Sequence, residues 1–194
     1  MLHIVDDEDV IRDALEWLAQ SRGLATRGYA GGQAFLDALG TEHDAGGECV
    51  LLDVRMPGMN GIAVFDQLVA RGLLARLPVI FLTGHGDVPM AVDTLKRGAF
   101  DFFEKPFNDN QLMDRVEEAL ARSRQAAASS AVHERLATLS AREREVLDLI
   151  LAGNMNKVVA DKLGISMRTV DVHRAHIFDK MQVKTAVELA GLLK

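Results

Sequence analysis

The chain is poor in several residue types, and each shortage excludes a class of protein. It has 194 residues and one cysteine, so no disulfide can form within it, and the apolar surroundings of Cys49 predict a reduced core thiol. No apolar run approaches the roughly 18 residues needed to span a bilayer. The N-terminus has no basic region followed by an apolar stretch, which a secretory signal would need. These absences predict a globular protein of the cytoplasm.

Charge is distributed unevenly along the chain. Residues 1–125 contain 12 Lys and Arg against 20 Asp and Glu, a net charge of −8, whereas residues 126–194 contain 10 against 8, a net charge of +2. The two halves therefore face different partners. A mildly basic segment joined to an acidic one could approach nucleic acid, although this charge alone is weak support.

Strand and helix patterns alternate in the first half. Strands are expected at 2–5, 25–29, 49–54, 78–83 and 101–105, and helices at 9–21, 31–39, 61–71, 87–97 and 108–122. Nearly continuous apolar strands such as VLLDV suit a parallel sheet that is buried on both faces. The pattern predicts an α/β, doubly wound sheet of five parallel strands, in which ligands bind beyond the carboxyl ends of the strands.

Polar residues follow the expected strands. Asp6 and Asp7 come after the first strand, Asp53 near the end of the third, Thr83 at the end of the fourth and Lys105 at the end of the fifth. The carboxyl ends of parallel strands share one edge of a sheet, so these side chains are expected to meet. Three ionised carboxylates repel one another unless a cation lies among them, and an all-oxygen site with room for water favours Mg²⁺.

Asp53 is the candidate nucleophile toward phosphorus in this arrangement, and its product would be an aspartyl phosphate. The metal ion and Lys105 would neutralise the charge on the transferred oxygens, while the Thr83 hydroxyl donates to one of them. Plainer readings exist, since Asp6 and Asp7 could merely favour a helix N-terminus and Lys105 could be a solvated surface residue. Under these alternatives, five residues at four strand ends would have to match the pattern of one site by chance.

The motifs VDDE, LLDVRMPGMNG, VIFLTGHGD and GAFDFFEKPF resemble, in this order and spacing, the receiver domain of bacterial two-component response regulators. The resemblance covers about residues 1–120 and implies a flavodoxin-like fold. It implies that Asp53 accepts a phosphoryl group from a histidine kinase. It also implies that Asp7 and Asp53 bind Mg²⁺ together with the backbone carbonyl of Arg55, that Asp6 holds the ion through water, and that Lys105 pairs with the phosphate.

A conformational switch is a further implication of this resemblance. Thr83 would move toward the phosphate, and Phe102 would turn inward to fill the space. The stretch TGHGDVPMAV and a Phe at position 102 look most like the FixJ branch of the NarL/FixJ regulators. Dimerisation through helix 87–97, strand 101–105 and helix 108–122 is the expected consequence.

The segment ARSRQAAASSAVHERLATL follows the first domain and reads as a linker. Good helix formers and the absence of Gly and Pro over residues 111–139 favour a helix over a flexible coil. The expected division is a receiver domain at 1–121, a helical linker at 122–138 and a small all-α domain at 139–194.

The last domain reads as four short helices. They are expected from the capping box of Ser140 and Glu143 to Gly153, at 156–163, at about 167–181 after the cap Ser166, and from a second capping box of Thr185 and Glu188. A helix, a tight glycine turn and a second helix form a helix-turn-helix, which places its second helix in the major groove of DNA.

This domain resembles the LuxR-type DNA-binding domain through LSAREREVL and the pattern G..NK.VA..LGIS.RTV..HR..I..KM.V. The likeness implies structural roles for Glu143 and Glu145. Phosphate-anchoring positions by this likeness are Asn156, Lys157, Arg168, Thr169 and Lys180, and positions near base edges are Asp171, Val172, His173 and Arg174. Met155 departs from the small polar residue that is common before the Asn.

The resulting hypothesis is a response regulator transcription factor that is not an enzyme. Its candidate partners are a sensor histidine kinase, double-stranded promoter DNA, a second copy when phosphorylated, and RNA polymerase. Two rivals remain. An aspartate-nucleophile phosphatase usually has a second aspartate two residues after the nucleophile, where this chain has Arg55. A module that sequesters a protein partner would never bind DNA, against which the retained stretch RTVDVHR argues.

Overall fold

The computed structural model describes residues 1–40, 46–84 and 88–193, and the chain divides into two compact units, 1–127 and 128–194. Each unit has its own apolar core, in keeping with its size. Across the described ranges, no helix has both the length and the apolar character that crossing a membrane requires.

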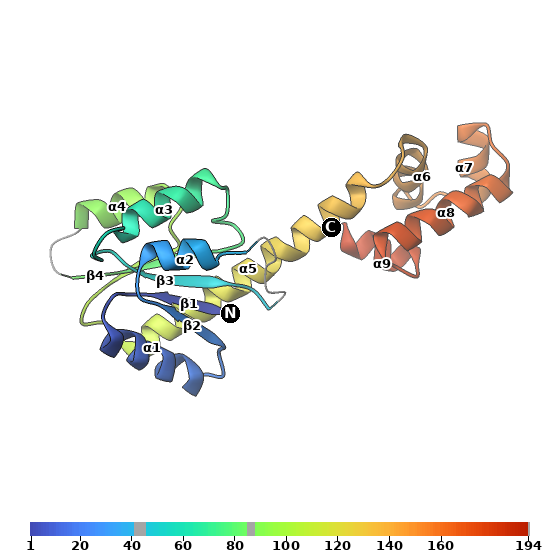
Figure 1. The fold of residues 1–194 in the computed structure, drawn as a ribbon. Helices are drawn as coiled ribbons and strands as arrows, with labels where there is room; N and C mark the ends of the chain where they lie inside the picture. Colours follow the sequence, from blue (N-terminus) through green and yellow to red (C-terminus); the bar gives the residue numbers. More distant parts are fainter. Residues whose placement is uncertain (41–45, 85–87, 194) are drawn as a thin grey trace. The chain divides into compact units, whose positions relative to one another are not determined.

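The first unit is built on five parallel strands in the order β2-β1-β3-β4-β5, shown in Figure 1. The strands are β1 (Leu2–Val5), β2 (Thr26–Tyr29), β3 (Cys49–Asp53), β4 (Val79–Thr83) and β5 (Asp101–Glu104). The central strands β1, β3 and β4 are buried along their whole length. This confirms the predicted doubly wound α/β fold, and Cys49 is a buried free thiol as expected.

Helices cover both faces of the sheet. They are α1 (Asp9–Ser21), α2 (Gly32–Ala38), α3 (Gly61–Ala70), α4 (Val88–Lys96) and α5 (Asp109–Ala137). Figure 1 shows α1 and α5 on one face of the sheet and α2, α3 and α4 on the other. Leu15 of α1 and Val116 of α5 belong to one apolar cluster, and Phe35 of α2 and Phe65 of α3 belong to the other. Residue 87, the expected start of the fourth helix, lies outside the described residues. The helix α5 continues through the stretch that was expected to be a linker.

The second unit contains α6 (Ala141–Leu151), α7 (Asn156–Leu163), α8 (Met167–Met181) and α9 (Ala186–Leu192). Val146, Ile177 and Leu189 are fully buried in its core. The helix α7 ends at Gly164, which has a left-handed backbone (φ 63°) and lets the chain turn directly into α8. These elements form the predicted helix-turn-helix.

Side-chain caps fix where these helices begin. Ser140 and Glu143 form the complete capping box that the sequence predicts, and Ser166 caps α8 as expected. The second predicted box is only half right. Thr185 accepts from the backbone of Glu188, but the Glu188 carboxylate bonds to the backbone of Lys184, one residue before the cap.

Candidate functional site

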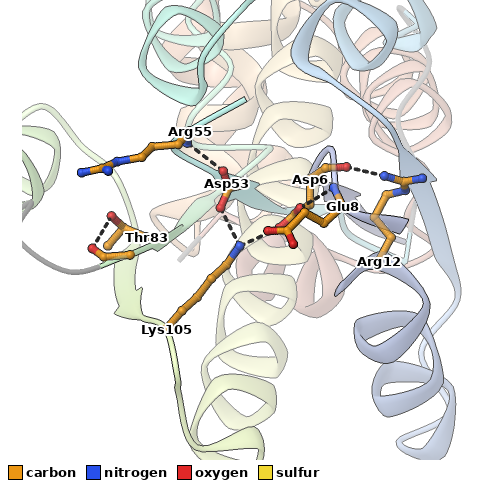
Figure 2. A network of polar contacts seen from close by, with 8 residues as sticks. Asp6, Glu8, Arg12, Asp53, Arg55, Thr83 and Lys105 are labelled. Carbon is orange, nitrogen blue, oxygen red and sulfur yellow. Dashed lines mark hydrogen bonds and ion pairs between the residues drawn. The ribbon is translucent and has the colours of Figure 1, made fainter. Parts of the chain in front are cut away.

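Lys105 joins two buried carboxylates at the carboxyl edge of the sheet. Asp6 follows β1 and Asp53 ends the neighbouring β3, and these two residues are 1% and 6% exposed. The Lys105 Nζ donates to Asp6 Oδ2 at 2.8 Å and to Asp53 Oδ1 at 2.6 Å (Figure 2). The structure therefore brings together three of the predicted residues, which come from segments far apart in the sequence.

The chain after β1 holds Asp6 in place. The Glu8 backbone donates to Asp6 Oδ1 at 2.9 Å, and the Arg12 guanidinium donates to the Asp6 carbonyl oxygen at 2.7 Å (Figure 2). The sequence prediction missed this role of Arg12. Its position four residues after Glu8, on the first turn of an expected helix, was the available signal, because such a residue lies over the preceding loop.

Burial and charge act in opposite directions on this cluster. Burial is the largest influence on Asp53 and raises the pKa of its carboxyl above the ordinary value, while the bond from Lys105 only partly opposes it. Burial also acts to lower the pKa of Lys105, but its bonds to Asp53 and Asp6 outweigh it, so that pKa is raised. The ammonium therefore stays charged at neutral pH, and further positive charge would stabilise ionised Asp53.

The loop after β3 wraps closely around Asp53. Its Oδ2 accepts a hydrogen bond from the Arg55 backbone at 2.7 Å, whereas the Arg55 side chain extends away from Asp53 (Figure 2). Gly58 has a left-handed backbone (φ 73°). At Gly61 a Cβ would overlap the carbonyl oxygen of Asp53, so only glycine fits. These features explain the glycines of the MPGMNG stretch.

The predicted switch residues, Thr83 and Phe102, lie on the adjacent strands β4 and β5. Thr83 is buried at the end of β4, and its hydroxyl donates to the Gly84 carbonyl at 3.1 Å (Figure 2). Phe102 pairs in register with Phe81 and is half-buried against the core on the α2–α4 side of the sheet. Their movement on phosphorylation stays a prediction.

The carboxylates of Asp6 and Asp53 suit a hard divalent cation, although three converging carboxylates were expected. Among the described residues, no group of three or more His, Cys, Asp or Glu is arranged to hold a metal ion. Asp7 is half-buried beside Asp6. Asp6, Asp53 and Lys105 together carry one net negative charge. Each carboxylate oxygen accepts one hydrogen bond and has a further lone pair, and such oxygens are the ligands that Mg²⁺ prefers. The residues present therefore fit the ion.

An apolar pocket adjoins this cluster, and the sequence prediction missed it. Its volume is about 720 Å³, and it is lined by Ile11, Ala14, Leu15, Trp17, Leu18, Lys105, Pro106, Phe107 and Asp109. Trp17, in α1, is 72% exposed. The available signal was that Val10 and Trp17 lie outside the apolar stripe that α1 buries in the core, so that this helix carries apolar residues on two faces.

The outward face of α8 carries part of the predicted DNA contacts. Val170, Ile177 and Met181 are buried, while Arg168, Asp171 and Val172 are exposed. His173 and Arg174 are only half-exposed, and the Arg174 guanidinium lies 5.2 Å from the ring centre of Phe178. Ala175 and His176 are also exposed, and the polar pattern of the sequence already places His176 on this face of the helix.

Other predicted contacts are engaged inside the second unit. Lys180 Nζ donates to Glu143 Oε2 at 2.7 Å and to the Thr138 carbonyl at 3.2 Å. The bonds from Lys180 and the Ser140 backbone lower the pKa of buried Glu143 to about 2. Thr169 helps to begin α8, because its backbone donates to the Ser166 hydroxyl at 3.1 Å. These contacts support structural roles for Lys180 and Thr169, whereas Lys157 is exposed.

Two known families match the two parts of the chain. Residues 2–117 match the family described as "Response regulator receiver domain", and residues 137–193 match "Bacterial regulatory proteins, luxR family". The chain is 52% identical to the C4-dicarboxylate transport transcriptional regulatory protein DctR of Rhodobacter capsulatus, over 98% of each protein. It is 46% identical to the transcriptional regulatory protein FixJ of Azorhizobium caulinodans, over 98% of this chain and 90% of that one.

Solved structures agree with these matches. The response regulator StyR, at low resolution, superposes with a TM-score of 0.73 and 37% identity, over 99% of this chain and 96% of that one. Full-length FixJ from B. japonicum superposes with a TM-score of 0.58 and 39% identity, over 98% and 94%.

Proposed function

The chain belongs to the two-component response regulators of the FixJ type, which join a receiver domain to a LuxR-type DNA-binding domain, and we propose that Asp53 is its phosphoacceptor. The chain is a transcription regulator of this family. The observation that carries the proposal is the shared Lys105 ammonium, which lies within 2.8 Å of both Asp6 and Asp53. A lysine held between two buried carboxylates is suited to receive a doubly charged phosphoryl group.

The proposed transfer takes place between Asp53 and a phosphohistidine of a sensor kinase. A carboxylate oxygen of Asp53 attacks phosphorus, the P–N bond breaks, the electron pair leaves with the imidazole, and an acyl phosphate remains. Lys105 then pairs with the phosphoryl oxygens, and Thr83 donates to one of them. Asp6, Asp7, Asp53 and the Arg55 carbonyl would hold Mg²⁺, which would supply positive charge for the transferred oxygens.

The apolar pocket supports a binding surface for the kinase. A phosphohistidine that reaches Asp53 brings the surrounding kinase surface over the adjoining residues, and Lys105 belongs to both the cluster and the pocket. Trp17 and Phe107 then supply apolar area beside the reacting groups. We propose that the kinase covers this pocket.

The second unit is proposed to bind double-stranded promoter DNA through α8. The family resemblance implies phosphate or base contacts at seven residues of the two helices. They are Asn156 and Lys157 of α7 and Arg168, Asp171, Val172, His173 and Arg174 of α8. Pairing of two phosphorylated copies through α4, β5 and α5 would read two half-sites about 10 bp apart and raise avidity. Contact with RNA polymerase would follow on the bound promoter.

The phosphoacceptor assignment is tested with Mg²⁺ and a small acyl phosphate. Intact-protein mass spectrometry is expected to show one phosphoryl group on the wild type and none on Asp53→Asn, because the amide is a poor nucleophile. Asp66→Asn, an exposed acid of α3, is the matched control and should label as the wild type does. Equal labelling of Asp53→Asn would overturn the assignment, and rapid turnover of the donor would favour the phosphatase rival.

A further inference from the structure

A side-chain hydrogen bond joins the two helices of the helix-turn-helix. Asn156 Nδ2, at the first residue of α7, donates to Asp171 Oδ1 in α8 at 2.6 Å. Asp171 is exposed and Asn156 is half-exposed, so the bonded pair lies at the surface of this unit. We propose that Asn156 is a positioning residue, which orients the Asp171 carboxylate to accept from the amino group of a cytosine. The proposal deepens the proposed DNA-binding function and rests on it.

A carboxylate on a DNA-facing helix needs a specific partner. Asp171 lies on the same outward face as Arg168 and Val172, where phosphates repel a negative charge. An ionised carboxylate only accepts hydrogen bonds, and the cytosine amino group is a donor in the major groove. The residue therefore favours sites that have this donor and weakens binding to sites that lack it, so it contributes selectivity rather than affinity.

The amide of Asn156 supplies the orientation. An exposed aspartate samples several rotamers, and a bond to Oδ1 restricts them while Oδ2 stays available as an acceptor. Restricting a side chain before binding lowers the entropy cost of its contact with a base. Met155, the cap residue of α7, makes no side-chain capping bond. Because the Asn156 amide donates to Asp171 of α8, a contact of this amide with a DNA phosphate would have to share or break that bond.

The experiment selects duplexes from a randomised library with the full-length protein, phosphorylated with Mg²⁺ and a small acyl phosphate. Wild type, Asn156→Ala, Asp171→Asn and the double variant are compared by sequencing the bound DNA. Asp148→Asn, an exposed acid of α6, controls for the loss of one negative charge. Circular dichroism and thermal melting confirm that each variant is folded.

The expected result is a cytosine preference at one position of each half-site for the wild type. Asp171→Asn should reduce that preference by about five- to 150-fold, which is the usual loss of affinity for one mismatched base pair. Binding to unrelated DNA should not weaken. Asn156→Ala should reduce the same preference severalfold and should have no further effect when Asp171 is already Asn.

Three results would overturn the inference. An unchanged base preference in Asp171→Asn would remove the reading role of the carboxylate. An equal loss of affinity for all sequences in Asn156→Ala, independent of residue 171, would make Asn156 a phosphate anchor instead. If the wild type bound no duplex at low salt, the proposed DNA-binding function would fail as well, which separates that failure from the first two.

Discussion

The two units of the chain use charge in opposite ways. In the first unit, Asp6, Asp53 and Lys105 come from distant segments and are drawn together into a largely buried cluster. In the second unit, the charged residues of the helix-turn-helix are distributed over an open surface, and Lys180 is tied to buried Glu143. Burial strengthens the few interactions that chemistry at Asp53 needs, whereas a surface that meets DNA can spread its charges over many weaker contacts.

The largest predicted effect is on phosphoryl transfer from the kinase to the first unit, and it concerns Trp17. With a histidine kinase that phosphorylates the wild type, Trp17→Ala is expected to slow transfer about 30-fold at low protein concentration, which equals about 2 kcal/mol for a large aromatic at an interface. Labelling by a small acyl phosphate should be unchanged, because Asp53 accepts its hydrogen bonds from Lys105 and the Arg55 backbone and not from Trp17. Rates of both reactions, followed by mass spectrometry, make the test.

Val69→Ala, a partly exposed apolar residue of α3, is the matched control for this substitution. It should leave both rates unchanged. An equal loss with both donors in Trp17→Ala would show that the residue supports the fold of the site, and the proposed kinase surface would then be wrong.

The next effect concerns Glu143, a buried carboxylate of the second unit that is paired with a lysine as Asp53 is in the first. Glu143→Ala removes half of a capping box and the partner of Lys180, so it should destabilise the second unit by about 2 kcal/mol. Hydrogen exchange in α6 and α8 should speed up, while the unfolding midpoint reported by Trp17 fluorescence in the first unit stays the same. Exposed Glu145→Ala is the control and should change little.

The same residue predicts a pH dependence. Because folding lowers the pKa of Glu143 from 4.5 to about 2, its contribution to stability is fully present above about pH 4.5 and is lost as the pH falls toward 2. Urea unfolding of the second unit at pH 6 and pH 3 measures it. The loss of stability between these values should be smaller in Glu143→Ala, and an identical loss in both proteins would contradict the assignment.

The smallest predicted effect is on DNA affinity, and it concerns Lys157, one of the exposed charges of the second unit. Lys157→Ala should weaken binding to all duplexes about fivefold, or about 1 kcal/mol, and should reduce the slope of log affinity against log salt by about 1. Lys184→Ala, an exposed lysine before α9, is the control and should keep the wild-type slope. A change in base preference instead of salt slope would place Lys157 among the reading residues.

Sequence patterns predicted much of the receiver unit for a clear physical reason. In a parallel sheet the carboxyl ends of all strands lie at one edge, so Asp6, Asp53 and Lys105 could be placed together once the strands were assigned. The bounds of α7 and α8 were also predicted closely, because Gly164 marks the end of α7 and Ser166 marks the start of α8.

The remaining features depended on contacts that no local pattern contains. The bond of Asn156 to Asp171 and that of Lys180 to Glu143 join residues of different helices, and their geometry follows from packing. The apolar pocket forms where α1 meets the loop after β5, which are separate in sequence. The convergence of Asp7 with the other carboxylates stays a prediction.

The most direct test of the account measures DNA affinity of the full-length protein with and without Mg²⁺ and a small acyl phosphate, for the wild type and Asp53→Asn. Phosphorylation of the wild type is expected to change its DNA affinity about five- to 150-fold, the usual range of allosteric coupling, and the affinity of Asp53→Asn is expected to stay the same. An equal response of both proteins, or phosphorylation of the wild type with no change in affinity, would contradict the account.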